Sequence, residues 1–301
     1  MQIGQRLRII EPRAFRHETF DELQDTISAI EKAAQNLAGV GAFEIVLHRV
    51  AWSVVFLVIV LLWLRRWQWL ASLRMQPQVL AMFTLSALVL ALNWLTYVWA
   101  VSNGHVIDAS LGYFINPLVS VALGYFVLHE RLRRWQWAAV ALATAGVAWL
   151  AALGPHIPWV GIVIAVSFAV YGLMRKTAAL GALEGLALET LLLAPPAIAL
   201  LAWWTVQGSG GLAGRSPATL AWLIGLGPMT SIPLLMFAAG ARRISLATLG
   251  LLQYVSPTIQ LALGVWVFGE ALGSERLAGF TLIWIALALF SIESWLHARR
   301  R

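Results

Sequence analysis

The stretch DASLGYFINPLVSVALGYFVLHERLRR, residues 108–134, decides how the rest of the chain is interpreted. Read as a helix, it places polar and small residues on one face at spacings of three and four, with a proline in the middle. These residues are Tyr113, Asn116, Pro117, Ser120 and Gly124. The spacing predicts an apolar helix that carries one polar stripe.

The same pattern returns 140 residues later in TLGLLQYVSPTIQLALGVWVFGEAL, residues 248–272. The matching positions, which align without gaps, hold Gln253, Ser256, Pro257, Gln260 and Gly264. The repetition predicts a duplicated unit in which each copy contains one broken, polar-striped helix. In membrane transporters, paired interrupted helices are the best sequence indication of the substrate site. We therefore expect both stripes to line one central substrate cavity.

The composition is that of an integral membrane protein, because 60% of the residues are hydrophobic, 12% are charged and the mean hydropathy is +0.78. The chain has no cysteine, which excludes disulfides, thiolate metal sites and a cysteine nucleophile. We expect no metal and no cofactor. The net charge of +7 comes from arginines clustered beside apolar runs, so membrane topology explains it better than nucleic-acid binding.

Nine apolar runs of spanning or near-spanning length are joined by short linkers. They cover residues 44–64, 78–101, 106–128, 135–153, 157–174, 184–206, 218–240, 245–268 and 277–296. The fold class predicted is an all-α polytopic membrane protein.

Residues 1–40 differ from this pattern, because they carry five basic and six acidic residues and no run that could cross about 30 Å of hydrocarbon. The run 157–174, shifted back by the repeat distance, falls on residues 17–34, where an apolar helix is missing. We expect an atypical segment over 1–40, a first repeat over 41–153 that lacks its opening helix, and a second repeat over 154–297. The chain is then either a protein of nine spans or a ten-span protein with a divergent or misread start.

The basic residues of the loops predict the orientation. Thirteen lie in loops on one side of the membrane, whereas the loops on the other side hold only Arg215 and Arg276. The basic side, with the C-terminus, should be cytoplasmic. A unit of five helices has an odd number of spans, so its second copy enters the membrane inverted.

Four ionisable residues are candidates for gating or coupling. Glu44, His48 and Arg49 open the first run, and Glu189, the repeat counterpart of Arg49, lies about one turn into the sixth. A charge at the centre of a membrane helix costs about 2.5–3.5 kcal/mol, so such groups need partners. Glu189 is a candidate either for a protonatable group or for one that pairs with an arginine, for which Arg49 is the candidate partner. The alternatives are that Arg49 reaches out to the interface, that His48 only packs, and that Glu189 is an interface residue.

Further candidates lie on the second run and at the two prolines. Asn93 and Tyr97 share a stripe that suits hydrogen bonds either to a substrate or to a neighbouring helix. Pro117 and Pro257 each leave a carbonyl unpaired one turn earlier, which either a water-filled cavity or an ordinary helix kink would accommodate. Glu130 is expected to be solvated at a helix end.

Three strings carry a resemblance to a known family: EIVLHRVAWS at 44–53, NWLTYVWAVSN at 93–103, and residues 108–130. Over about residues 38–296 the chain resembles the RarD branch of the EamA family, in the drug/metabolite transporter superfamily. The resemblance implies a ten-helix transporter of the bacterial inner membrane, built from two inverted five-helix repeats, in a group named for chloramphenicol sensitivity.

The function expected is secondary transport of a small metabolite or drug such as chloramphenicol by alternating access. The alternative is a non-transporting membrane protein that has lost its first helix. The chain contains no H-E-x-x-H or G-x-S-x-G motif, so we do not expect an enzyme. The expected partners are a small-molecule substrate and the lipid bilayer, without nucleic acid, and the possibility of a homodimer is left open.

Overall fold

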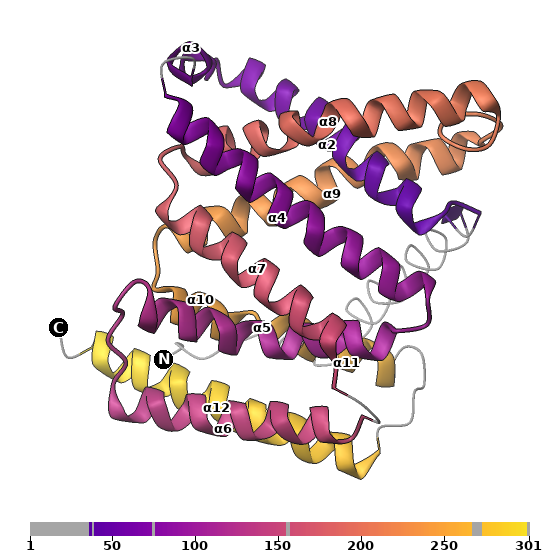
Figure 1. Ribbon diagram of the computed structural model, residues 1–301. Coiled ribbons are helices and arrows are strands. Elements are labelled where there is room, and N and C mark those ends of the chain that lie inside the picture. The colour runs from indigo at the N-terminus through magenta and orange to yellow at the C-terminus, as the bar shows by residue number, and fades with distance from the viewer. Residues whose placement is uncertain (1–35, 38, 74–75, 155–156, 267–272, 300–301) are drawn as a thin grey trace, which may run out of the picture.

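The computed structural model describes residues 36, 37, 39–73, 76–154, 157–266 and 273–299, in which there are helices and loops but no strands (Figure 1). Eight of these helices are long and apolar enough to cross a membrane. They are α2 (Ala42–Trp63), α4 (Pro77–Ser102), α5 (Val106–Phe126), α6 (Arg134–Ala152), α7 (Trp159–Thr177), α8 (Ala182–Gln207), α9 (Pro217–Ala241) and α12 (Ser274–Ala298). The all-helical, polytopic fold class is confirmed.

Three shorter helices complete the described part of the chain: α3 (Gln68–Leu73), α10 (Leu246–Leu252) and α11 (Val255–Trp266). The eighth predicted run is thus divided, because the helix breaks at Gln253 and Tyr254, shortly before Pro257. Proline cannot donate the hydrogen bond that would continue the helix across this point.

The sequence pattern predicted a break in both striped helices. This prediction is wrong for α5, which continues through Pro117. The two stretches, 108–134 and 248–272, are similar in sequence but differ in backbone conformation at the proline. Helix α10 packs closely against α5 at this proline: a Cβ added to Gly250 would lie 2.8 Å from the Pro117 carbonyl oxygen and 2.8 Å from Ser120 Cβ. Neighbouring helices of this kind allow a membrane helix to tolerate an internal proline.

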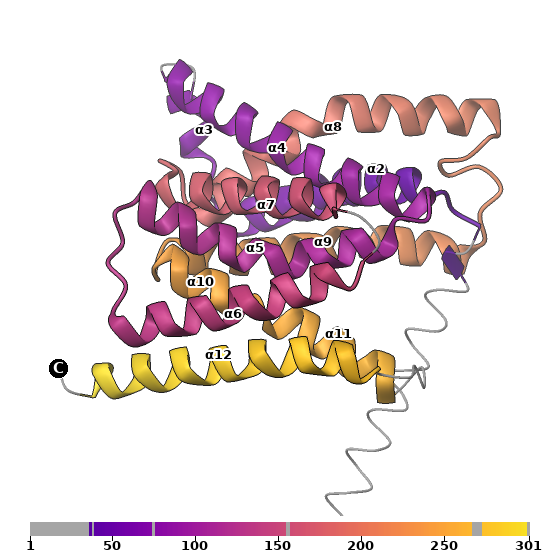
Figure 2. The same ribbon diagram turned by 60° about the horizontal axis from the view of Figure 1, so that its bottom comes forward.

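The helices are arranged around α7, which packs against both α4 and α5. Helices α6 and α12 lie side by side at one edge of the bundle, and α2 packs against α8 and α9 (Figures 1 and 2). Glycines allow the closest crossings. A Cβ on Gly112 of α5 would lie 2.9 Å from the Gly161 carbonyl oxygen of α7, and a Cβ on Gly146 of α6 would lie 2.9 Å from the Gly279 carbonyl oxygen of α12.

The helix starts repeat along the chain. Helices α2, α4, α5 and α6 begin at residues 42, 77, 106 and 134, and α8, α9, α10 and α12 each begin 140 residues later. This spacing is the one found in the sequence, although the division into two repeats stays a prediction. The counterpart of the run 157–174, at 17–34, lies outside the described residues, as do the structural predictions for 1–35.

Candidate functional site

Three helices, α4, α5 and α9, place polar and aromatic side chains around Arg49 of α2. This residue lies seven positions into α2, about 10 Å along the helix from its start. Its Nε donates a hydrogen bond to Thr230 Oγ1 of α9 at 3.0 Å. Its guanidinium carbon lies 4.7 Å from the ring centroid of Trp94 of α4, which is the geometry of a cation–π contact.

Two tyrosines complete this group. The rings of Tyr97 on α4 and Tyr113 on α5 meet edge to face with centroids 6.3 Å apart. Both tyrosines lie near enough to Arg49 to interact with it electrostatically, and each is partly exposed. We call these five residues, Arg49, Trp94, Tyr97, Tyr113 and Thr230, the Arg49 site.

Arg49 has no acidic partner among the residues that the structure describes. Its single hydrogen bond uses Nε and leaves both terminal nitrogens without a protein partner in those same residues. Neither nitrogen is among the buried polar atoms that lack a partner, so both keep some exposed surface.

The rest of the α5 stripe takes part in helix packing. Asn116 is buried and donates to the Ala165 carbonyl oxygen of α7 at 2.9 Å. Pro117 and Ser120 are buried where α10 approaches. Of the α5 stripe, only Tyr113 belongs to the Arg49 site.

The other predicted cavity residues are divided in the same way. Asn93 is buried and donates to the Ile164 carbonyl oxygen and to Ser167 Oγ of α7, which is the interhelical alternative. Gln253 lies at the break between α10 and α11, Ser256 is exposed on α11, and Pro257 is buried. The side chain of Gln260 lies outside the described part of the structure.

Glu44 and His48 form a separate cluster from Arg49. The Glu44 carboxylate is buried and accepts two hydrogen bonds of 2.9 Å from Arg215 Nη2, and one of 2.7 Å from the Gly211 amide. His48 Nε2 lies 3.7 Å from the same carboxylate. These contacts fasten the start of α2 to the loop between α8 and α9.

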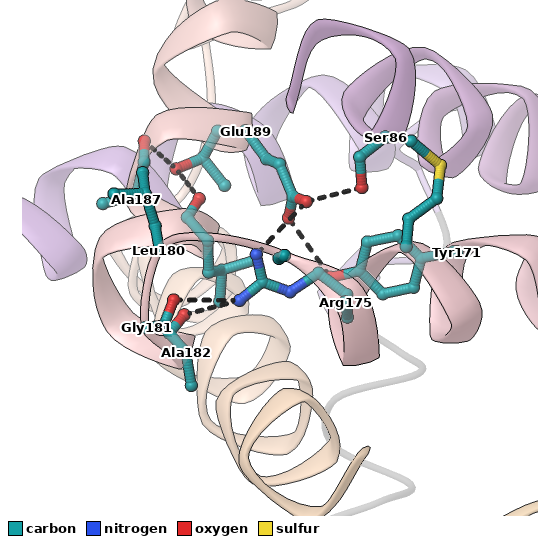
Figure 3. Close-up of polar contacts among 12 residues, drawn as sticks. Ser86, Tyr171, Arg175, Leu180, Gly181, Ala182, Ala187 and Glu189 are labelled. Carbon is teal, nitrogen blue, oxygen red and sulfur yellow. Dashed lines mark hydrogen bonds and ion pairs between the residues drawn. The ribbon is translucent and has the colours of Figure 1, made fainter. Parts of the chain in front are cut away.

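Glu189 pairs with Arg175, not with Arg49 as the sequence pattern suggested (Figure 3). Both side chains are 0% exposed, and Arg175 Nη1 lies 3.5 Å from Glu189 Oε1. Ser86 and Tyr171 donate to the same carboxylate at 2.6 and 3.2 Å. Arg175 Nη2 also donates to the carbonyl oxygens of Gly181 and Ala182 at the start of α8, so this cluster joins α4, α7 and α8.

Glu130 is not simply solvated. Its carboxylate accepts hydrogen bonds from the amides of Leu246 and Ala247 at 2.7 and 3.0 Å, and therefore caps the start of α10. Lys176 Nζ lies 3.7 Å from the same carboxylate.

Sequence reasoning missed Trp94 and Thr230 in the Arg49 site, and Arg175 as the partner of Glu189. Trp94 resembles the many other tryptophans of an apolar chain. Arg175 follows the last residue of an apolar run, so it was assigned to a loop. Only the positions of neighbouring helices reveal these partners.

Comparison with known proteins agrees with this architecture. The profile of the EamA-like transporter family matches residues 29–152. An uncharacterized transporter of Pseudomonas aeruginosa is 45% identical, over 88% of this chain and 89% of its own length. The protein RarD of Streptomyces exfoliatus is 46% identical, over 86% of this chain and 82% of its own length.

A more distant relative, the chloramphenicol-sensitive protein RarD of Pseudomonas aeruginosa, is 33% identical over 84% of this chain and 85% of its own length. One protein of known crystal structure has the same fold, with a TM-score of 0.65 and 20% identity over 88% of this chain and 93% of that one. The chain belongs to the RarD branch of the EamA-like transporter family, which is part of the drug/metabolite transporter superfamily.

Proposed function

We propose that the protein is a secondary transporter that moves a small amphipathic metabolite or drug across the bacterial inner membrane by alternating access. The observation that carries this proposal is the Arg49 site. It brings α2, α4 and α5 of the predicted first repeat together with α9 of the predicted second repeat. In transporters with inverted repeats, substrates bind between the repeats near the middle of the membrane.

The chemistry of the site suits an amphipathic molecule. Arg49 and Thr230 offer polar groups, and Trp94, Tyr97 and Tyr113 offer aromatic surface. Chloramphenicol is one compound to test, because one relative is named a chloramphenicol-sensitive protein. Transport by alternating access needs no covalent chemistry. We therefore propose a transporter without enzymatic activity.

Uptake into proteoliposomes tests the proposal. The full chain should show saturable uptake of at least one labelled compound from a panel of chloramphenicol, amino acids and other small metabolites. Arg49→Gln should reduce that uptake at least tenfold, whereas Arg131→Gln, which changes an exposed arginine outside the site, should not. Absence of saturable uptake across the panel would favour the non-transporting alternative.

Thiol labelling tests the position of the site. The chain has no cysteine, so single cysteines can be introduced without background. Cysteines in place of Tyr97 and Tyr113 should react with a small water-soluble reagent, and a substrate should protect them. A cysteine in place of Asn116, which is buried against α7, should not react. Equal reactivity at all three positions would contradict the assignment of Asn116 to packing.

A further inference from the structure

Arg49 differs from three other basic side chains that are buried or partly buried. Arg175 has Glu189, Arg215 has Glu44 and Lys176 has Glu130 as a carboxylate within 3.7 Å. Arg49 has no such carboxylate among the described residues, although it lies two turns into a membrane helix. An unbalanced charge inside hydrocarbon is costly, so its position calls for a negative partner that the described residues do not supply.

The free part of the guanidinium has the geometry to bind an anion. Thr230 holds Nε, and Trp94 lies against the guanidinium, so two contacts fix its orientation. The two terminal nitrogens, which have no partner in the described residues, form the planar pair that binds a carboxylate through two parallel hydrogen bonds. A lysine in this position would offer a point charge without that geometry.

The surroundings of the guanidinium suggest the rest of the ligand. Trp94 is 7% exposed, while Tyr97 and Tyr113 are each 37% exposed and meet edge to face. Aromatic rings bind flat apolar and aromatic groups through offset or edge contacts. The Arg49 site thus combines one cationic group with an aromatic surface made by Trp94, Tyr97 and Tyr113, which we call the aromatic wall.

We propose that the Arg49 site binds small organic monoanions, in which a carboxylate pairs with Arg49 and an aromatic or apolar body packs on Trp94, Tyr97 and Tyr113. This inference rests on the proposed function and narrows its substrate class to carboxylates. An uncharged compound such as chloramphenicol would meet the aromatic wall without the ion pair and would bind more weakly.

Direct binding tests the substrate class separately from transport. The probes are three compounds with the same phenyl body: 3-phenylpropanoate, the neutral 3-phenylpropanamide and the cationic 3-phenylpropylamine. Titration calorimetry with the full chain in phosphatidylcholine nanodiscs should detect the carboxylate, with affinity at least tenfold above those of the amide and the amine.

Variants locate the binding. Arg49→Gln should weaken carboxylate binding at least tenfold, Arg49→Lys should weaken it less, and Arg131→Gln should leave it unchanged. A monodisperse elution profile and an unchanged thermal midpoint establish that Arg49→Gln is folded. If that variant does not fold, Tyr113→Ala should lower the affinities for the carboxylate and the amide by similar factors, because it removes aromatic wall and not charge.

The inference is overturned if the amide or amine binds as well as the carboxylate, if folded Arg49→Gln keeps full carboxylate affinity, or if none of the three probes binds. A lipid phosphate is a second source of negative charge, so the titration is repeated in nanodiscs containing phosphatidylglycerol. Loss of carboxylate binding there would assign Arg49 to a lipid headgroup and also overturn the inference. If the binding results overturn the monoanion inference, saturable uptake of an uncharged compound would still support the proposed function.

Discussion

Arg175 and Arg49 show how differently two arginines can be accommodated in one helical bundle. Arg175 is fully buried, with Glu189 beside it and two carbonyl oxygens at the start of α8 accepting from it. Arg49 has one hydroxyl, an aromatic ring and no carboxylate among the described residues. The sequence showed that Arg49 and Glu189 were unusual, but not which helix faces would meet them.

Removing one partner of the buried pair should be costly. Glu189→Leu leaves the Arg175 charge buried without its carboxylate, and we expect a loss of about 3–5 kcal/mol of stability. The double change Glu189→Leu with Arg175→Met should recover most of that loss, because no buried charge remains. Chemical unfolding in detergent, followed by circular dichroism, gives the stabilities.

The control for these stability measurements is Glu184→Gln, which removes the partner of Arg66. Arg66 is 63% exposed and lies 3.3 Å from the Glu184 carboxylate, so this pair should contribute about 0–1 kcal/mol. If Glu184→Gln and Glu189→Leu had the same cost, burial would not be the cause.

At the level of helices, apolar runs were enough to predict the eight spanning helices of the described residues. Each of the nine runs corresponds to a helix or, at 245–268, to the pair α10 and α11. The sequence did not show that α5 continues through Pro117 while the repeat helix breaks before Pro257. Gly250 of α10 packs beside Pro117, and the sequence did not reveal this contact. The sequence likewise located the polar stripe of α5 but not its neighbours. Asn116 contacts α7, and Pro117 and Ser120 lie against α10.

Close helix crossings should be sensitive to one added methyl group. A Cβ on Gly161 of α7 would lie 2.5 Å from the Asp108 carbonyl oxygen of α5, a backbone atom that cannot turn aside. Gly161→Ala should therefore force α5 and α7 apart and cost about 1–3 kcal/mol. Thermal unfolding in detergent should show a lower midpoint.

The matched control is Gly225→Ala in α9. A Cβ added to Gly225 meets nothing within 4 Å, so this change should leave the midpoint unchanged or raise it slightly, because alanine favours a helix over glycine. Equal destabilisation by both alanines would mean that helix flexibility, not the crossing distance, sets the effect.

For the molecule as a whole, loop charges indicate its orientation. Burial of Arg175 removes it from the thirteen basic residues assigned to the cytoplasmic side, which leaves twelve against two. The bias is unchanged, and we still propose a cytoplasmic C-terminus. Loop composition can support an orientation because the positive-inside rule acts on whole loops, whereas a binding site depends on individual contacts.

Labelling of intact cells should report this orientation. Ser209 lies in the α8–α9 loop and Arg131 in the α5–α6 loop, and both are exposed. A membrane-impermeant maleimide should modify Ser209→Cys in intact cells, but Arg131→Cys only after permeabilisation. The unsubstituted chain, which has no cysteine, is the control for background labelling. The reverse labelling pattern would invert the topology.

The charge of Arg49, which no carboxylate among the described residues balances, has an electrical consequence. A membrane voltage exerts no net force on the Arg175–Glu189 pair, whose charges cancel, but it acts fully on Arg49. Moving one elementary charge across the whole field is worth about 2.3 kcal/mol per 100 mV, and a smaller displacement is worth its fraction of that. An interior-negative potential therefore favours conformations in which the empty site lies nearer the cytoplasm. A bound monoanion cancels the charge, so the loaded site would reorient without responding to voltage.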